Sequence, residues 1–206
     1  MAQWFVIHEG LTAAARVPSL ARSRQRMSAL ELLVLLASGA GAAAAVGMAK
    51  LGLGIPGHSI VLAALPVAFG LSVAPRRLAG SVMSAGAVGT AWLLQGAGTA
   101  SYGSGSLVSL CLLGPMMDLA LRGARSGWRV YAALVLAGTA TNLTALASRA
   151  AAKLVGLDLA GARPFDSWWL QAMGTYTASG IVAGLLGAFC WFHLNDRLTP
   201  ARRAGN

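Results

Sequence analysis

Long apolar stretches alternate with short polar segments along the whole chain. The apolar stretches number six and cover approximately residues 28–50, 58–74, 78–95, 107–121, 128–147 and 172–194. Because a helix of about 20 mainly apolar residues spans the hydrocarbon core of a membrane, this pattern predicts an all-α integral membrane protein built as a six-transmembrane-helix bundle. The stretches 58–74 and 107–121 are short, and Pro66 lies inside the first. We therefore expect 58–74 to be tilted, kinked or an incomplete crossing.

The composition supports this interpretation. The chain has 206 residues, of which 56% are hydrophobic and 11% charged, and its mean hydropathy is +0.65. A soluble domain carries about 25% charged residues, so this chain has too little polar surface for water. Its net charge of +10 comes from basic residues in short groups between the apolar stretches. Since these groups form no single basic face, we expect the lipid bilayer and no nucleic acid as a partner.

The basic residues also predict an orientation. If all six stretches cross, twelve of the sixteen Lys and Arg residues share one side of the membrane and four lie on the other. Cytoplasmic loops carry the excess of Lys and Arg, so this asymmetry predicts a multi-pass protein of the cytoplasmic (inner) membrane with both termini in the cytoplasm (N-in/C-in). The four residues on the opposite side are Lys50, Arg149, Lys153 and Arg163.

The same pattern divides the chain into three parts. Residues 28–195 form the predicted six-helix transmembrane domain, and residues 196–206 form a basic cytoplasmic tail. Residues 1–27 are a basic N-terminal segment containing Trp4 and Phe5. Such a segment lies at the membrane surface as an interfacial stretch or extends as a disordered basic arm, and both alternatives stay open.

Small residues line one face of the first predicted helix. Ala37, Gly41, Ala45 and Ala49 recur every four residues and therefore share a face. Small side chains let helix backbones approach closely inside a membrane, where contact depends on packing. This face is either a packing surface within the bundle or a docking surface for a partner protein.

Two glycine-rich loops on the predicted outer side carry candidate substrate-binding residues. Gly57, His58 and Ser59 end the first loop, and Tyr102 lies in the second. A neutral imidazole binds a metal ion or an organic substrate, or His58 simply caps its loop. Asn142 lies in a polar patch of the fifth apolar stretch, where it either bonds neighbouring helices or contacts substrate.

The chain contains little that indicates catalysis, and we expect no enzymatic activity. It has no paired carboxylates, no His-Glu-x-x-His motif and no nucleotide-phosphate loop. Asp118 is the main acidic residue inside an apolar stretch, but it lies one turn from Arg122, which suggests an ion pair at the membrane interface. An unrecognised membrane enzyme using Asp118 is the third alternative.

The loop sequences carry a family resemblance over roughly residues 40–120. The residues concerned are Ile55, Pro56, Gly57 and His58, then Leu62, Ala63, Ala64 and Gly70, then Gln95, Gly103, Gly105, Ser106 and Leu107. Together with the six predicted spans and the Ala-rich first helix, these residues make the sequence resemble the S-components, the substrate-binding membrane subunits of energy-coupling factor (ECF) transporters. It is most similar to their cobalt/nickel type, and residues 179–184 carry a weaker similarity.

The resemblance implies a substrate-capture subunit of an ATP-driven uptake transporter. Its partners would be a transmembrane coupling protein and ATPase subunits, docking on the face of Ala37, Gly41, Ala45 and Ala49. The family's metal-binding histidine would correspond to His58, with Co²⁺ or Ni²⁺ as substrate. Metal-type members also use a histidine at their second residue, which here is Ala2, and both ions prefer several nitrogen ligands.

The substrate is therefore a metal ion or a small organic micronutrient. The alternative function is a non-transporting structural membrane subunit that packs in a larger complex through its first helix.

Overall fold

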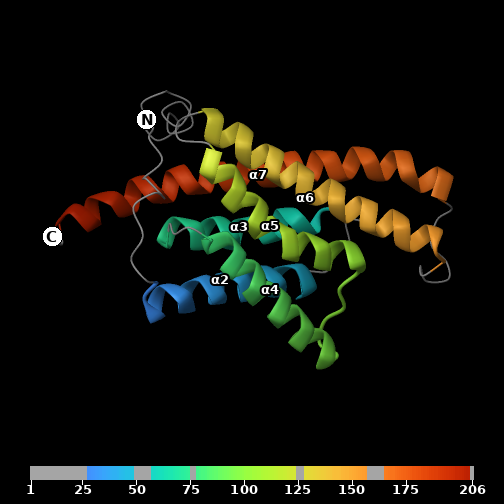
Figure 1. Ribbon diagram of the computed structural model, residues 1–206, viewed down its shortest axis with the longest axis horizontal. Coiled ribbons are helices and arrows are strands. Elements are labelled where there is room, and N and C mark those ends of the chain that lie inside the picture. The colour runs from blue at the N-terminus through green and yellow to red at the C-terminus, as the bar shows by residue number, and fades with distance from the viewer. Residues whose placement is uncertain (1–26, 49–56, 75–77, 124–127, 157–164, 205–206) are drawn as a thin grey trace.

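The structure is a computed structural model that describes residues 27–48, 57–74, 78–123, 128–156 and 165–204. All regular structure in these ranges is α-helical (Figure 1). The helices are α2 (Ala29–Met48), α3 (Ser59–Val73), α4 (Ala79–Gly96), α5 (Ser104–Gly123), α6 (Trp128–Leu154) and α7 (Phe165–Ala204). The fold of the described residues is thus all-α, as predicted, and each of the six apolar stretches overlaps one of these helices.

Four of these helices are long and apolar enough to cross a membrane, namely the segments Ala29–Met48, Ser104–Arg122, Trp128–Leu154 and Ser167–Trp191. Helix α3 is apolar but has only 15 residues, about 22 Å at 1.5 Å per residue, which is less than the hydrocarbon thickness of about 30 Å. Pro66 lies inside α3 without ending it. The four long apolar helices indicate a multi-pass membrane protein.

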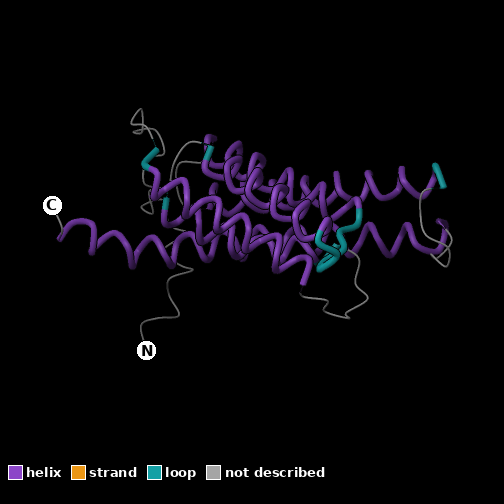
Figure 2. The backbone as a smooth tube through the Cα atoms, turned by 90° about the horizontal axis from the view of Figure 1, so that it is seen from below, coloured by secondary structure: helices purple, strands orange, loops and turns teal. Residues whose placement is uncertain are grey.

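The helices pack side by side into a closed ring. Helix α2 contacts α3 and α4, α4 contacts α5, α5 contacts α6, α6 contacts α7, and α7 contacts α3. Figure 2 shows the bundle turned by 90°, with the helices running mainly along its long axis. Successive helices run in opposite directions, so the C-terminal ends of α2, α4 and α6 and the N-terminal ends of α3, α5 and α7 lie at the same end of the bundle (Figure 1). We call this the loop end, and the opposite end, where Arg122 and Arg129 lie, the arginine end.

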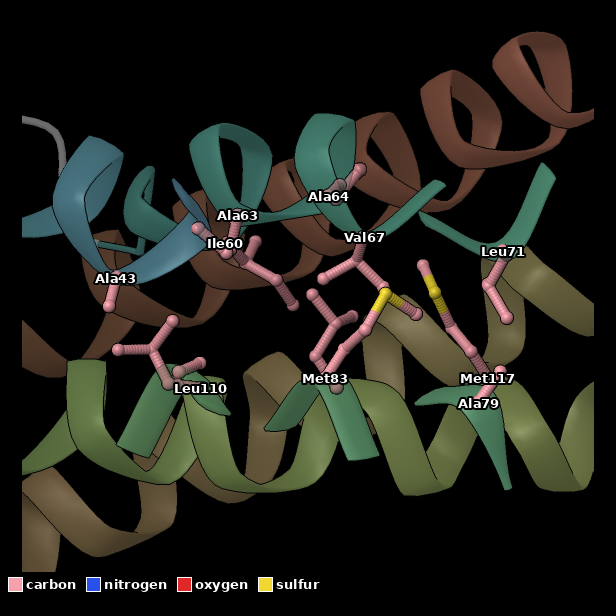
Figure 3. Close-up of a cluster of buried hydrophobic side chains, with 14 of the residues drawn as sticks. Ala43, Ile60, Ala63, Ala64, Val67, Leu71, Ala79, Met83, Leu110 and Met117 are labelled. Carbon is pink, nitrogen blue, oxygen red and sulfur yellow. The ribbon is translucent and has the colours of Figure 1, made fainter. Parts of the chain in front are cut away.

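The interior of the ring is filled by small and medium apolar side chains. Figure 3 shows Val67 of α3 facing Met83 of α4 and Met117 of α5 across the centre. All three are at least 97% buried. Helices α6 and α7 also approach each other closely, because a Cβ built on Gly180 would lie 2.7 Å from the Cα of Thr139. Such close approach between small residues is the usual basis of helix packing inside membranes.

The outer surface of the ring is strongly apolar. Leu30 and Leu33 of α2, Leu136 of α6 and Leu170 of α7 are each between 65% and 78% exposed. Soluble monomers rarely expose apolar patches on this scale. A lipid environment accounts for such a surface, because it imposes no cost on exposed leucine side chains.

Local signals define the helix ends. Ser28 and Glu31 form a capping box at the start of α2, in which the Glu31 backbone N–H donates to Ser28 Oγ and the Ser28 N–H donates to Glu31 Oε2. At the other end of the chain, α7 continues to Ala204 and so runs through most of the predicted tail 196–206. The predicted N-terminal segment 1–27 lies outside the described residues except for Met27.

Candidate functional site

A buried asparagine connects three elements near the loop end. Asn142 of α6 is completely buried, and its Nδ2 donates hydrogen bonds to the carbonyl oxygen of Tyr176 in α7, at 2.6 Å, and to that of Gly57, at 3.3 Å. Gly57 immediately precedes His58, the N-cap of α3. Of the five predicted substrate-binding residues, the structure thus brings Gly57 and Asn142 together, and it adds Tyr176.

The backbone at Gly57 requires glycine for two reasons. Its φ of 84° is in the left-handed region that side chains with a Cβ avoid. A Cβ built there would lie 2.9 Å from Cγ of Tyr176 and 3.1 Å from Asn142 Nδ2. The start of α3 is therefore held tightly against α6 and α7 at this point.

Several polar atoms around Asn142 are buried without a partner. Within the described residues, Asn142 Oδ1, Thr141 Oγ1 and Ser109 Oγ of α5 make no hydrogen bond. Gly105 of α5 lies against Ala145 of α6. Ser109 comes one turn after Gly105, and Thr141 comes one turn before Ala145. Because α5 and α6 are antiparallel, the hydroxyl groups of Ser109 and Thr141 lie at the same level along the two helices. Most buried polar side-chain atoms have a partner, so these unsatisfied, uncharged atoms are candidate contacts for a polar molecule.

Tyr176 borders the same site through its hydroxyl group. A Cβ built on Gly105 would lie 3.3 Å from Tyr176 Oη and 3.3 Å from the carbonyl oxygen of Ala145. The residue itself is buried, and its carbonyl oxygen is the acceptor for Asn142. Tyr176 is not among the residues predicted from the sequence, although the chain has only three tyrosines and this one lies inside an apolar stretch. We define the polar site by Ser109, Thr141, Asn142 and Tyr176.

The other predicted substrate-binding residues have different surroundings. Tyr102 is buried in the α4–α5 loop and donates a hydrogen bond to the carbonyl oxygen of Ala43 in α2, at 2.9 Å. Burial raises the pKa of the Tyr102 hydroxyl above its ordinary value of 10, so the group is a neutral donor. His58 and Ser59 are half-buried at the start of α3, and the His58 side chain makes no capping hydrogen bond with that helix.

The donor set near His58 does not fit a transition-metal site. Within the described part of the chain, no group of three or more His, Cys, Asp or Glu residues comes together. Co²⁺ and Ni²⁺ prefer several nitrogen ligands, whereas the polar site offers amide and hydroxyl oxygens. These groups suit a hydrogen-bonding organic molecule better than a metal ion.

The predicted docking face of α2 points away from the ring. Ala37 and Gly41 are exposed, Ala45 is half-buried, and Ala49 lies outside the described residues. Packing inside the ring is carried by a neighbouring row of small residues on the same helix. This row consists of Ser38, Gly39, Ala42, Ala43 and Gly47. The face of Ala37 and Gly41 is therefore available to a partner or to lipid.

Asp118 has a structural role that the sequence did not suggest. Its carboxylate accepts hydrogen bonds from the Gly80 backbone N–H at 2.9 Å, from the Ser81 N–H at 2.8 Å and from Ser81 Oγ at 2.8 Å. These donors lie in the first turn of α4, where a negative charge also stabilises the helix dipole. The prediction of an Asp118–Arg122 ion pair is wrong, because Asp118 caps α4 and pairs with no described basic side chain.

Comparison with models of protein families, with curated proteins and with solved structures finds no match for this chain. The resemblance to ECF transporter S-components therefore stays a prediction from the sequence.

Proposed function

We propose that the chain is a membrane-embedded substrate-binding subunit of an ATP-driven uptake transporter, of the ECF S-component kind, and that it captures a small organic molecule. The observation that carries the proposal is the polar site. Asn142 Oδ1, Thr141 Oγ1 and Ser109 Oγ are buried among apolar helices without a partner in the described residues. A bound molecule that donates and accepts hydrogen bonds would satisfy them.

The position of the site supports capture from the loop end. Gly57 and Asn142 are joined where α3 begins, and Gly105 lies near Tyr176 Oη where α5 begins. Helices α6 and α7 continue past this level toward their own connection (Figure 1). In the proposed orientation the loop end faces outward and the arginine end faces the cytoplasm, in keeping with the distribution of basic residues.

The exposed small-residue face of α2 favours a protein partner. Ala37 and Gly41 present little side chain, so another helix can approach the α2 backbone closely. In the proposed transporter this partner is the transmembrane coupling protein. The same face also supports the alternative, a structural subunit that packs in a larger complex without binding substrate.

Partner capture separates the two functions. The tagged chain is purified in mild detergent from the membranes of its own organism, and co-purifying proteins are identified by mass spectrometry. A polytopic coupling protein with ATPase subunits supports the transporter proposal. A stable assembly without ATPases, recovered from the same membranes, supports the structural alternative.

A further inference from the structure

Two basic residues lie on the same helix face as Asn142, nearer the end of α6. Arg149 and Lys153 follow Asn142 by seven and eleven residues, spacings that return to one face of an α-helix. At 1.5 Å per residue they lie about 10 and 16 Å farther along the axis toward the loop end. Both side chains are half-buried.

Aromatic residues occupy the matching position on α7. Phe165 and Trp169 precede Tyr176 by eleven and seven residues and share its helix face. Their rings are stacked, with centroids 5.5 Å apart and an interplanar angle of 20°. The polar site thus continues along α6 and α7 into a segment lined by cations on one helix and aromatic rings on the other.

Trp168 holds the two cations close together. The Arg149 Cζ atom is 5.8 Å from the centroid of the Trp168 ring, and the Lys153 Nζ atom is 5.2 Å from it. The indole is buried, and cation–π attraction of this kind keeps both side chains over one ring. The Trp168 ring thus brings both cationic side chains of α6 to one place at the loop end.

Arg149 is able to bind an anion in this position. It makes no hydrogen bond or ion pair with any other described residue, apart from its contact with the Trp168 ring. A guanidinium group has five N–H donors in a geometry that matches a carboxylate or phosphate. The basic residues predicted on this side of the membrane number only four, and two of them meet here.

We propose that Arg149, Lys153 and Trp168 form an anion-binding vestibule above the polar site, and that the substrate is an organic anion bearing a carboxylate or phosphate group. This inference rests on the proposed function for the identity of its ligand. The anionic group binds the cations while a hydrogen-bonding part of the molecule reaches Asn142 farther in. The same cations raise the local concentration of anions at the entrance.

The test uses inorganic phosphate as a probe on the purified full-length chain in detergent. Tryptophan fluorescence is followed during titration with phosphate, with chloride at equal ionic strength as the reference. We expect a saturable response in the unaltered chain and at least a tenfold weaker response in R149Q/K153Q, because hydrogen bonds to charged groups are lost. The matched control R122Q/R129Q removes two exposed arginines at the other end and keeps the response.

A folding control and a lipid arm make the result decisive. We expect R149Q/K153Q to keep the circular-dichroism spectrum of the unaltered chain, so that a loss of charge is distinguishable from a general loss of folding. An equal response in R149Q/K153Q and the unaltered chain overturns the proposal. A response that requires vesicles of phosphatidylglycerol and is absent with phosphate alone also overturns it, in favour of a lipid headgroup.

The substrate itself provides the second measurement. An anionic small molecule released from the purified chain, and lost in R149Q/K153Q, supports the vestibule. A neutral or cationic molecule overturns the vestibule but leaves substrate capture intact. Recovery of no molecule, together with normal phosphate binding, counts against the proposed function and not against the anion site.

Discussion

Replacing Gly57 by alanine tests the tight junction between α3, α6 and α7. At φ 84° a Cβ is strained, which costs about 1–2 kcal/mol. The new atom also meets Cγ of Tyr176 at 2.9 Å and the Cα of Tyr176 at 3.1 Å. Since one of these atoms belongs to the α7 backbone, the helices must separate slightly, and overpacking of this kind adds about 1–3 kcal/mol.

We therefore expect Gly57→Ala to lower the free energy of unfolding by about 2–5 kcal/mol, the sum of strain and overpacking. Unfolding is measured in mixed micelles by titration with a denaturing detergent and followed by circular dichroism. Two other glycines of the chain separate the two causes. Gly98 has a φ of 68° but no atom within 4 Å of a built Cβ, whereas Gly103 is also open and has no positive φ.

The structure therefore predicts the order in which the three glycine substitutions destabilise the chain. Gly98→Ala loses about 1–2 kcal/mol from strain alone, and Gly103→Ala is near neutral. The reasoning is refuted if Gly57→Ala is no more destabilising than Gly98→Ala, because the contact with Tyr176 would then contribute nothing.

Three other predictions concern separate parts of the ring. Asp118→Asn keeps the size of the α4 cap but removes an acceptor of the Gly80 N–H; we expect a loss of about 1–3 kcal/mol in the same unfolding assay, and an unchanged stability would contradict the capping role. Tyr102→Phe removes the hydrogen bond to Ala43 and costs about 0.5–1.5 kcal/mol. Because burial raises the pKa of Tyr102 in the folded state, its contribution is complete below pH 10 and falls as the pH rises further, so the two proteins should converge in stability in strong alkali. Gly41→Leu places a large side chain on the exposed face of α2; we expect normal folding but loss of the co-purifying partner, and retention of the partner would show that it binds elsewhere.

The positions of the helices could be predicted from the sequence because each is apolar over most of its length. The predicted stretch 58–74 differs by one residue at each end from α3 (Ser59–Val73), and 78–95 differs by one at each end from α4 (Ala79–Gly96). Helix α7 was predicted too short, since its ends are polar and hydropathy detects the membrane-embedded part of a helix only. The Ser28–Glu31 capping box was present in the sequence as Ser-x-x-Glu and could have fixed the start of α2.

The contacts of the candidate site could not be predicted in the same way. That Asn142 binds Gly57 and Tyr176 depends on the order of helices in the ring, which hydropathy does not encode. The same limit explains the error at Asp118. Proximity in the sequence suggested Arg122 as the partner of Asp118. The first turn of α4 crosses α5 at this point, however, and offers three hydrogen-bond donors to the Asp118 carboxylate.

The sequence predicted a face of small residues on α2 but not which row of them is exposed. Small residues cover most of α2, and spacing alone does not say which row packs inside. The structure assigns Ser38, Ala42 and Gly47 to the interior and leaves Ala37 and Gly41 outside.

If the polar site binds a small organic molecule, that molecule should be found on the purified chain. The chain is purified in mild detergent, washed and denatured, and the released small molecules are identified by mass spectrometry beside two variants. Asn142→Leu removes the buried amide, whereas Thr144→Val is the matched control, because Thr144 is exposed and bonds only the carbonyl oxygen of Ala140 in its own helix.

We expect one organic compound in stoichiometric amount from the unaltered chain and from Thr144→Val, and its absence from Asn142→Leu. Equal recovery from both variants, or a metal ion as the only bound species, would contradict this expectation.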